Sequence, residues 1–133
     1  MRKFNKSSIL ELKNLLCDSY VHDAKLKKFN YTLGENCIEI ELFNPIFNVK
    51  LNLTCHGIEA ALATKGGWGG SRETVLSLSA EDDFSCLKKL VPTLNNGAED
   101  YIYLLIQTFS GDELHIVSRE VNVETFRDEQ IVE

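Results

Sequence analysis

Residues 47–55 read Phe-Asn-Val-Lys-Leu-Asn-Leu-Thr-Cys, and this stretch decides the fold. Apolar side chains occupy every second position without exception: Phe47, Val49, Leu51, Leu53 and Cys55. Alternation with a period of two predicts a β-strand with one buried and one exposed face. The core of the domain is therefore expected to lie on one side of a sheet.

Two similar runs precede this strand. Residues 25–33 alternate at their end, and residues 38–42 place Glu39 and Glu41 between apolar neighbours. A turn is expected at 34–36, and a second at Asn44-Pro45, because proline fixes φ and restricts the residue before it. Three strands joined by such short turns predict an antiparallel meander.

Upstream of the meander the period changes to that of a helix. Ile9, Leu12, Leu15 and Leu16 recur at spacings of three and four, which predicts one apolar stripe facing the core. Ser8 and Glu11 fit a capping box at its start.

Downstream, residues 58–64 and a segment around 75–78 are expected to be strands. Pro92 is expected to end a short helix that opens at Glu81-Asp82-Asp83. A final hairpin joins 101–109 to 113–123 through a turn at 110–112. Both faces of 101–109 are largely apolar, so this strand is expected to be central, and a homodimer is one way to cover its second face.

These elements predict an α+β fold. An N-terminal helix packs on a curved, mostly antiparallel sheet of six or seven strands, with a short second helix. Residues 1–133 are expected to form a single domain, with 1–7 and 124–133 as ends that can fray.

Composition excludes several classes of protein. The chain has 133 residues and a charge of 14 − 20 = −6, with 44% apolar residues. That apolar fraction excludes a disordered acidic chain, and no apolar run is long enough for a membrane span. The N-terminus lacks a signal peptide's apolar region, and the acidic balance argues against nucleic-acid binding. A cytoplasmic domain is expected.

Charge is uneven along the chain. Residues 1–28 carry 7 − 3 = +4, and the remaining 105 residues carry 7 − 17 = −10. This asymmetry can steer a charged partner, or the basic N-terminal part can neutralise an acidic sheet internally. The second interpretation is favoured.

The cysteines give no metal signature. Cys17, Cys37, Cys55 and Cys86 form no C-x-x-C pair, so zinc is not indicated. Without an export signal they are interpreted as reduced and buried, with disulfides as the minority alternative.

The histidines are similarly weak indicators of catalysis. Cys55 and His56 are neighbours on a strand and point to opposite faces, which disfavours a nucleophile–base pair. His115 is expected at a surface position. His22 and Asp23 are expected to form a capping or hydrogen-bonding pair at a helix-to-strand junction, and they lack the further ligands that a metal would need. No cofactor or metal is therefore predicted.

Two features could bind a partner. The loop Lys65-Gly66-Gly67-Trp68-Gly69-Gly70-Ser71 either exposes Trp68 as a contact residue or folds it over the sheet as a lid. Acidic groups cluster at element starts and turns, where solvated caps are the default interpretation and a partner surface is the alternative: Glu81, Asp82, Asp83, Glu99 and Asp100.

The junction His22-Asp23-Ala24 and the closing turn Ser110-Gly111-Asp112 carry a resemblance. The chain resembles a loose group of small bacterial proteins that have an HDA or HDS junction after a short helix. Some of that group look like immunity proteins encoded beside polymorphic toxins. The resemblance implies a role in binding, and it transfers no catalytic residue.

The expected function is therefore a non-enzymatic protein-binding domain, with an immunity protein that neutralises a basic toxin surface as its specific form. The alternative is a small-ligand-binding or enzymatic domain with a cleft at residues 65–71. A purely structural role in a dimer is the third hypothesis.

Overall fold

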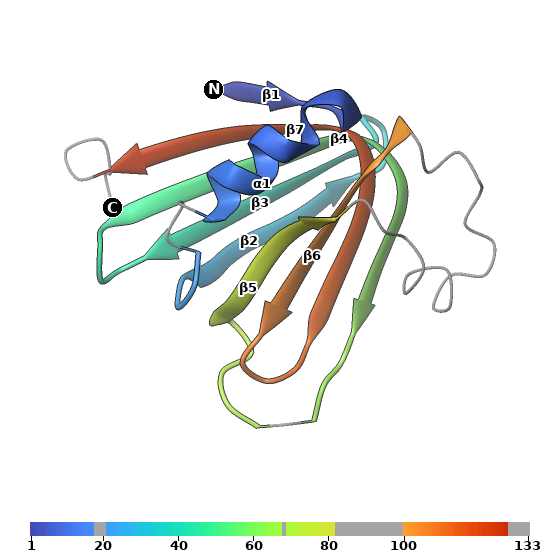
Figure 1. Ribbon diagram of the computed structural model, residues 1–133. Coiled ribbons are helices and arrows are strands. Elements are labelled where there is room, and N and C mark those ends of the chain that lie inside the picture. Colours follow the sequence, from blue (N-terminus) through green and yellow to red (C-terminus); the bar gives the residue numbers. More distant parts are fainter. Residues whose placement is uncertain (18–20, 68, 82–99, 128–133) are drawn as a thin grey trace.

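The computed structural model describes residues 1–17, 21–67, 69–81 and 100–127 (Figure 1). Its elements are β1 (Arg2–Phe4), the 3-10 helix η1 (Lys6–Ser8), α1 (Ile9–Cys17), β2 (Lys25–Thr32), β3 (Cys37–Asn44), β4 (Val49–Thr64), β5 (Val75–Glu81), β6 (Ile102–Thr108) and β7 (Glu113–Arg127). The strands form one seven-stranded sheet in the order β2-β3-β4-β7-β6-β5, with β1 paired to β7. The expected α+β class is confirmed. Glu81, expected to open the second helix, instead ends β5, and the rest of that expected helix lies outside the described residues.

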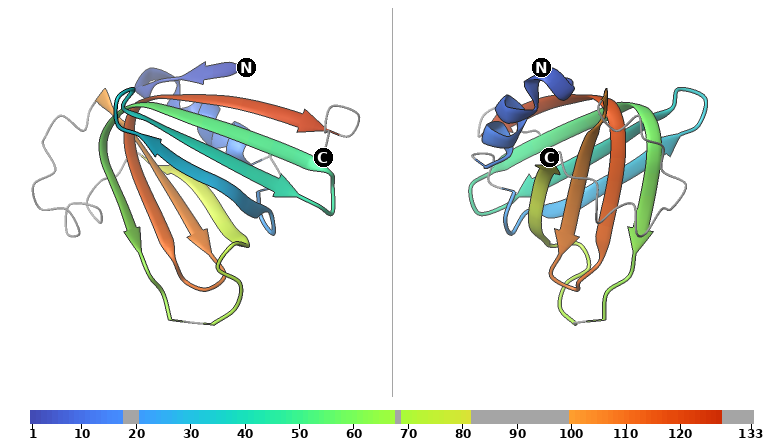
Figure 2. Two further views of the ribbon diagram at one scale, coloured as in Figure 1. Left: turned by 180° about the vertical axis from the view of Figure 1, so that it is seen from behind. Right: turned by 45° about the vertical axis from the view of Figure 1, so that its right-hand side comes forward.

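The sheet folds into two layers because its two longest strands bend. β4 has 16 residues and β7 has 15, and they pair along their whole length. Gly57 in β4 has a φ of 67°, and the register shifts between Ile58 and Ala60. A Cβ atom at Gly57 would lie 3.1 Å from the side chain of Arg119 on β7, so glycine suits this bend. Figure 2 shows the two halves turning sharply away from each other.

We call the half that contains β2, β3, the start of β4 and the end of β7 the first layer. The half that contains β5, β6, the end of β4 and the start of β7 is the second layer. Backbone hydrogen bonds join the two layers at one corner, where Asp23 donates to Val75, Val75 to Ala24 and Leu26 to Glu73 over 2.7–2.9 Å. Beyond this corner β2 and β5 diverge (Figure 2).

The core lies between the layers. It takes the alternate inward side chains of both layers, among them the fully buried Ile38, Leu53, Leu104 and Ile116. Helix α1 packs against β5 and β1 and buries Ile9, Leu12 and Leu16 in this core. The apolar stripe expected for the helix is thus confirmed, and burial of these side chains supplies most of its stability.

The start of the helix differs from the expectation. Asn5, not Ser8, is the N-cap, and its side chain accepts a hydrogen bond from the Ser7 amide while Ser8 bonds back to the Asn5 amide. The cap lies earlier because a turn of 3-10 helix precedes α1. Residues before it do not fray: β1 pairs with β7 from Arg2↔Val123 to Phe4↔Val121. At the other end, Glu124–Arg127 continue β7, and 128–133 lie outside the described residues.

The strand at 47–55 is confirmed with one change at its start. Val49, Leu51, Leu53 and Cys55 are buried, but Phe47 lies in the preceding turn and is 55% exposed. The Asn44 side chain holds this turn by accepting hydrogen bonds from the amides of residues 46 and 47. The strand expected at 58–64 is the continuation of β4 beyond its bend.

The final hairpin is confirmed. β6 lies between β5 and β7, with Leu104 fully buried on its inner face and Tyr103 only 3% exposed on its outer face. Tyr103 and Leu104 are thus buried on opposite faces of this strand within the chain, whereas Tyr101 and Leu105 on the outer face are half-buried. No helix of the described ranges is long and apolar enough to cross a bilayer.

Candidate functional site

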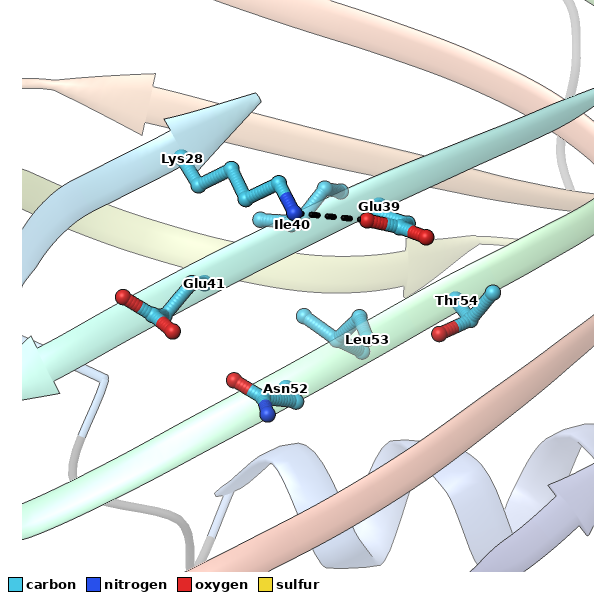
Figure 3. Close-up of a pocket in the computed structure, with 7 residues that line it drawn as sticks. All are labelled: Lys28, Glu39, Ile40, Glu41, Asn52, Leu53 and Thr54. Carbon is cyan, nitrogen blue, oxygen red and sulfur yellow. Dashed lines mark hydrogen bonds and ion pairs between the residues drawn. The ribbon is translucent and has the colours of Figure 1, made fainter. Parts of the chain in front are cut away.

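The candidate site is a hollow on the outer face of the first layer. It has a volume of about 250 Å³ and is lined by residues of β2, β3 and β4: Lys28, Glu39, Ile40, Glu41, Asn52, Leu53 and Thr54. Figure 3 shows these side chains around two neighbouring strands and the end of Lys28 reaching over toward Glu39. We call it the outer hollow.

The strand register places these residues together. Glu41 lies opposite Lys28 on β2 and Asn52 on β4, and Glu39 lies opposite Thr54. Glu39, Glu41, Asn52 and Thr54 are each one position away from a buried core residue, so their side chains point outward, and the register puts Lys28 on the same face. The same alternation that builds the core therefore gathers polar groups from distant parts of the chain on the opposite face.

Two ion pairs hold the charges of this face in place. Lys28 Nζ lies 2.7 Å from Glu39 Oε2, and Lys50 Nζ lies 3.1 Å from Glu41 Oε1. The hydrogen bond and the negative charge of Glu39 raise the pKa of Lys28 above its usual value. About half of each side chain in the Lys28–Glu39 pair is exposed, so solvent screens this pair and it adds little to stability.

Two amide oxygens on this face lack donors. Asn52 Oδ1 and Asn122 Oδ1 are buried atoms that accept no hydrogen bond within the described part of the chain. Asn52 lines the outer hollow, and Asn122 lies on β7 directly opposite Thr54. A buried acceptor without a donor costs about 1–3 kcal/mol, so a ligand whose N–H group reached Asn52 Oδ1 in the hollow would gain from that contact.

The expected pair His22 and Asp23 lies at the corner that joins the two layers. His22 Nδ1 is 2.7 Å from the Leu76 carbonyl oxygen, whereas His22 Nε2 is 3.7 Å from Asp23 Oδ1. Asp23 has a φ of 69° and its amide donates to Val75. At 3.7 Å the two side chains do not hydrogen-bond to each other, and the hydrogen-bond partners of this junction are backbone atoms of β5.

The structure places two of the expected acidic residues. Glu81 ends β5 and lines a hollow of about 250 Å³ beside α1, and Asp100 precedes β6 and lines a wider hollow of about 450 Å³ with Arg119. Both lie at the same end of the β5–β6 pair, but they face different hollows. Asp82, Asp83 and Glu99 lie outside the described residues.

Trp68 also lies outside the described residues, but the residues beside its loop are fixed. Asp112 in the β6–β7 turn accepts hydrogen bonds from the Gly66 amide at 2.8 Å and from Arg72 Nε at 2.9 Å. These bonds lower the pKa of the Asp112 carboxyl, with the Gly66 amide as the main cause. A Cβ atom at Gly66 would lie 2.3 Å from the Gly111 backbone, so only glycine allows this approach. The three hollows described above are lined by other residues.

His115 is not at the surface. It is 5% exposed on the outer face of the second layer, and its Nδ1 lies 2.6 Å from the Tyr103 hydroxyl. Its Nε2 is 3.5 Å from Glu113 Oε1, and Glu113 Oε2 accepts from Gln107 at 2.9 Å. The expected surface position of His115 is wrong, because alternation along a strand distinguishes its two faces but does not show which face is covered.

The order Tyr103–His115–Glu113 has the form of a nucleophile, a base and a carboxylate. Burial argues against that use, because Tyr103 and His115 are both almost inaccessible and stack at 5.8 Å between ring centroids. The chain of polar side chains therefore acts in the packing of β6 against β7.

The cysteines follow the expectation with one exception. Cys37 and Cys55 are buried and carry free thiols, and burial raises the pKa of the Cys55 thiol to about 12. Cys17 is exposed at the end of α1, because it follows the buried Leu16 onto the outer side of the helix. Cys86 lies outside the described residues. Across the described ranges, no three His, Cys, Asp or Glu side chains gather as metal ligands.

Sequence reasoning missed the outer hollow. It placed Glu39, Glu41, Asn52 and Thr54 on the outward side of their strands, but it could not show that these positions are neighbours. The signal that could have found the hollow is the pairing of 38–42 with 50–54 in an antiparallel meander.

A scan against protein-family models found no match to this chain, and a search of curated proteins likewise found none.

Proposed function

We propose that this chain is a non-enzymatic, cytoplasmic protein-binding domain, and that it binds a basic region of its partner at the outer hollow. The observation that carries the proposal is the buried Oδ1 atom of Asn52, which lacks a donor among the described residues in a hollow lined by Glu39 and Glu41. Guanidinium and ammonium groups supply several N–H donors and a positive charge, which suits these acceptors.

The geometry of the face favours binding over catalysis. The carboxylates of Glu39 and Glu41 are already engaged by lysines at 2.7 and 3.1 Å, which fixes their positions. A fixed polar surface loses little side-chain entropy when a partner docks, and its charges improve specificity and association rate.

The specific form of the proposal is an immunity protein that neutralises a toxin by covering a basic surface. The acidic balance of −6 for the whole chain supports attraction of a basic partner. The resemblance at His22-Asp23-Ala24 and in the closing hairpin supports the same role by analogy.

The test is co-expression with the product of a toxin-like gene adjacent to the gene for this chain. The wild-type chain is expected to restore growth, and the double variant Glu39→Lys/Glu41→Lys to fail. Glu11→Lys, an exposed position on α1, is the matched control and is expected to protect as the wild type does. Circular dichroism of each variant shows whether it folds.

A direct measurement complements the growth assay. An arginine-rich peptide is titrated into the protein, and the side-chain amide signals of Asn52 and Asn122 are followed by NMR. Shifts of these signals that an aspartate-rich peptide does not produce support the proposal. Unchanged amide signals together with protection by the Glu39→Lys/Glu41→Lys variant would overturn it.

A further inference from the structure

A second surface lies on the free edge of β2. Along residues 27–32 the only described strand that pairs with β2 is β3, because the contacts to residues 73–75 stop at Leu26. All of these six residues are exposed. Figure 2 (right) shows β2 at the edge of the first layer, running in a direction different from that of β5.

This edge carries an apolar strip. Phe29 and Tyr31 are 39% and 44% exposed and occupy alternate positions on the inner side of the strand, and Leu33, 80% exposed, follows them in the β2–β3 turn. Two of them are aromatic, and exposed aromatic residues are favoured anchors in protein interfaces. Edge strands commonly carry lysines that prevent aggregation, and β2 has the apolar strip in addition to such lysines at its start.

The strip is held in position before a partner arrives. The Tyr31 hydroxyl donates to Asn36 Oδ1 at 2.9 Å, and Asn36 Nδ2 donates to the Ile58 carbonyl at 3.1 Å. Asn36 adopts a left-handed φ of 50°, which suits asparagine in the β2–β3 turn. This chain of contacts ties the Tyr31 ring to the bend of β4 and lowers the entropy lost on binding.

Charge on the edge selects the partner. Lys27 is exposed at an irregularity between Leu26 and Lys28, and it forms no ion pair with a described residue. Lys25 and Lys28 lie beside it, each near a glutamate. A second copy of the chain would bring two such lysine groups to one short edge and is disfavoured by their repulsion. An acidic residue in an added strand would instead complement Lys27.

We propose that the β2 edge binds an extended segment of a partner protein by strand addition, and that this segment alternates apolar and acidic residues. Its backbone pairs with β2, its apolar side chains cover Phe29 and Tyr31, and an acidic side chain lies near Lys27. This surface shares Lys28 with the outer hollow, but Phe29 and Tyr31 lie on the opposite face of β2, and the proposal stands whether or not the hollow binds a basic partner.

The test uses two dye-labelled peptides of equal length, one alternating valine with glutamate and one alternating valine with lysine. Fluorescence anisotropy is expected to show that the glutamate peptide binds at least about tenfold more tightly, because opposite charges add to strand pairing. The NMR amide signals of residues 27–32 are expected to shift and to gain protection from hydrogen exchange.

Three variants locate the binding. Phe29→Ser and Lys27→Glu are expected to weaken the glutamate peptide, and Lys27→Glu to improve the lysine peptide. Ile46→Ser removes an apolar side chain that is 70% exposed, more than the 39% of Phe29, from the β3–β4 turn and is expected to change nothing. The Glu39→Lys/Glu41→Lys variant, which disables the outer hollow, is expected to retain the glutamate peptide.

Equal affinity for both peptides, or binding that survives Phe29→Ser, would overturn the proposal. Sedimentation of the free protein tests whether a second copy of the chain occupies the β2 edge. A dimer that Phe29→Ser abolishes would assign the edge to a second copy of the chain and would also overturn the proposal.

Discussion

The outer faces of the two layers differ although the same two strands run through both. In the first layer β4 presents Asn52 and Thr54 around an open hollow. In the second layer the outer face contains a small apolar cluster in which Val117 is 1% exposed and Tyr103 is 3% exposed. The bend at Gly57 separates these two environments.

The difference shows how to interpret polar groups on a sheet. The second layer has the more enzyme-like arrangement, because Tyr103, His115 and Glu113 follow one another within 3.5 Å. Because Tyr103 and His115 are buried, this arrangement belongs to the packing of β6 against β7. Buried polar atoms without a hydrogen-bond partner among the described residues occur in both layers: Asn52 Oδ1 and Asn122 Oδ1 in the first, His115 Nε2 and Ser118 Oγ in the second. What distinguishes the first layer is its exposed ion pairs, and this exposure makes it the surface available to a partner.

The largest effect is expected from removing the bend between the two faces. Gly57→Val places a β-branched residue at a φ of 67° and a Cβ atom 3.1 Å from Arg119. Left-handed strain and overpacking together are expected to lower the free energy of unfolding by about 3 kcal/mol. Chemical denaturation measures this loss.

Gly34→Val is the matched control. Gly34 lies in the β2–β3 turn, and a Cβ atom added there would have nothing within 4 Å, so its change in stability is expected to be much smaller. Equal losses for the two variants would show that Gly57 does not set the bend.

The second prediction compares one chemical change on the two faces. Tyr103→Phe removes the hydroxyl that bonds His115 Nδ1 at 2.6 Å and leaves a buried ring nitrogen without this partner. The expected loss in the free energy of unfolding is about 1–3 kcal/mol, because a buried polar group is left unsatisfied. Thermal and urea unfolding measure it.

Tyr31→Phe removes a hydroxyl with a similar bond, to Asn36, at an exposed site. Water replaces that bond, so the loss is expected to stay below about 0.5 kcal/mol. A loss for Tyr31→Phe as large as that for Tyr103→Phe would contradict the contrast between the open and the buried surface.

The sequence predicts the strands and their two faces, but it does not show which face of each strand is buried. Alternation at 47–55 and 101–109 correctly predicts the strands and their two faces, because side chains on a strand alternate strictly. Alternation does not show which face of a strand is covered by other parts of the chain. His115 alternates with Leu114 and Ile116 as a surface residue would, and yet it is buried.

The outer hollow shows the second limit. Glu39 and Thr54 are 15 residues apart, and only the register of β3 against β4 makes them neighbours. Register depends on turn geometry, and the β3–β4 turn begins the strand at Val49 and leaves Phe47 outside it. The corner at His22 depends on contacts with β5, which lies about 50 residues away in the chain.

The third prediction concerns acid. The folded state lowers the pKa of Asp112, so the stabilisation from this carboxylate is present above its ordinary pKa of 3.8 and is lost as pH falls through the folded-state value. Asp112→Asn is therefore expected to reduce stability at neutral pH and to flatten the fall in the unfolding midpoint below about pH 4. The control is Asp100→Asn, because Asp100 is exposed and bonds no described residue. This variant is expected to show the same fall in the unfolding midpoint at low pH as the wild type. A fall in the unfolding midpoint below about pH 4 that is the same in Asp112→Asn as in the wild type would contradict the stabilising role of the Asp112 carboxylate.

The smallest effect is expected on the open face. Glu39→Gln removes the carboxylate that raises the pKa of Lys28, so that pKa is expected to fall toward 10.5. NMR titration of the Lys28 side chain between about pH 9 and pH 12 measures the change. Because the folded state raises this pKa, any stabilisation from the pair is present below pH 10.5 and is lost at higher pH. The pair is half exposed, so the urea midpoint at pH 7 is expected to remain unchanged in Glu39→Gln. A clear fall in that midpoint would mean that the first layer depends on its outer ion pairs for folding. The contrast between a surface that is open for binding and one that is closed for stability would then have to be abandoned.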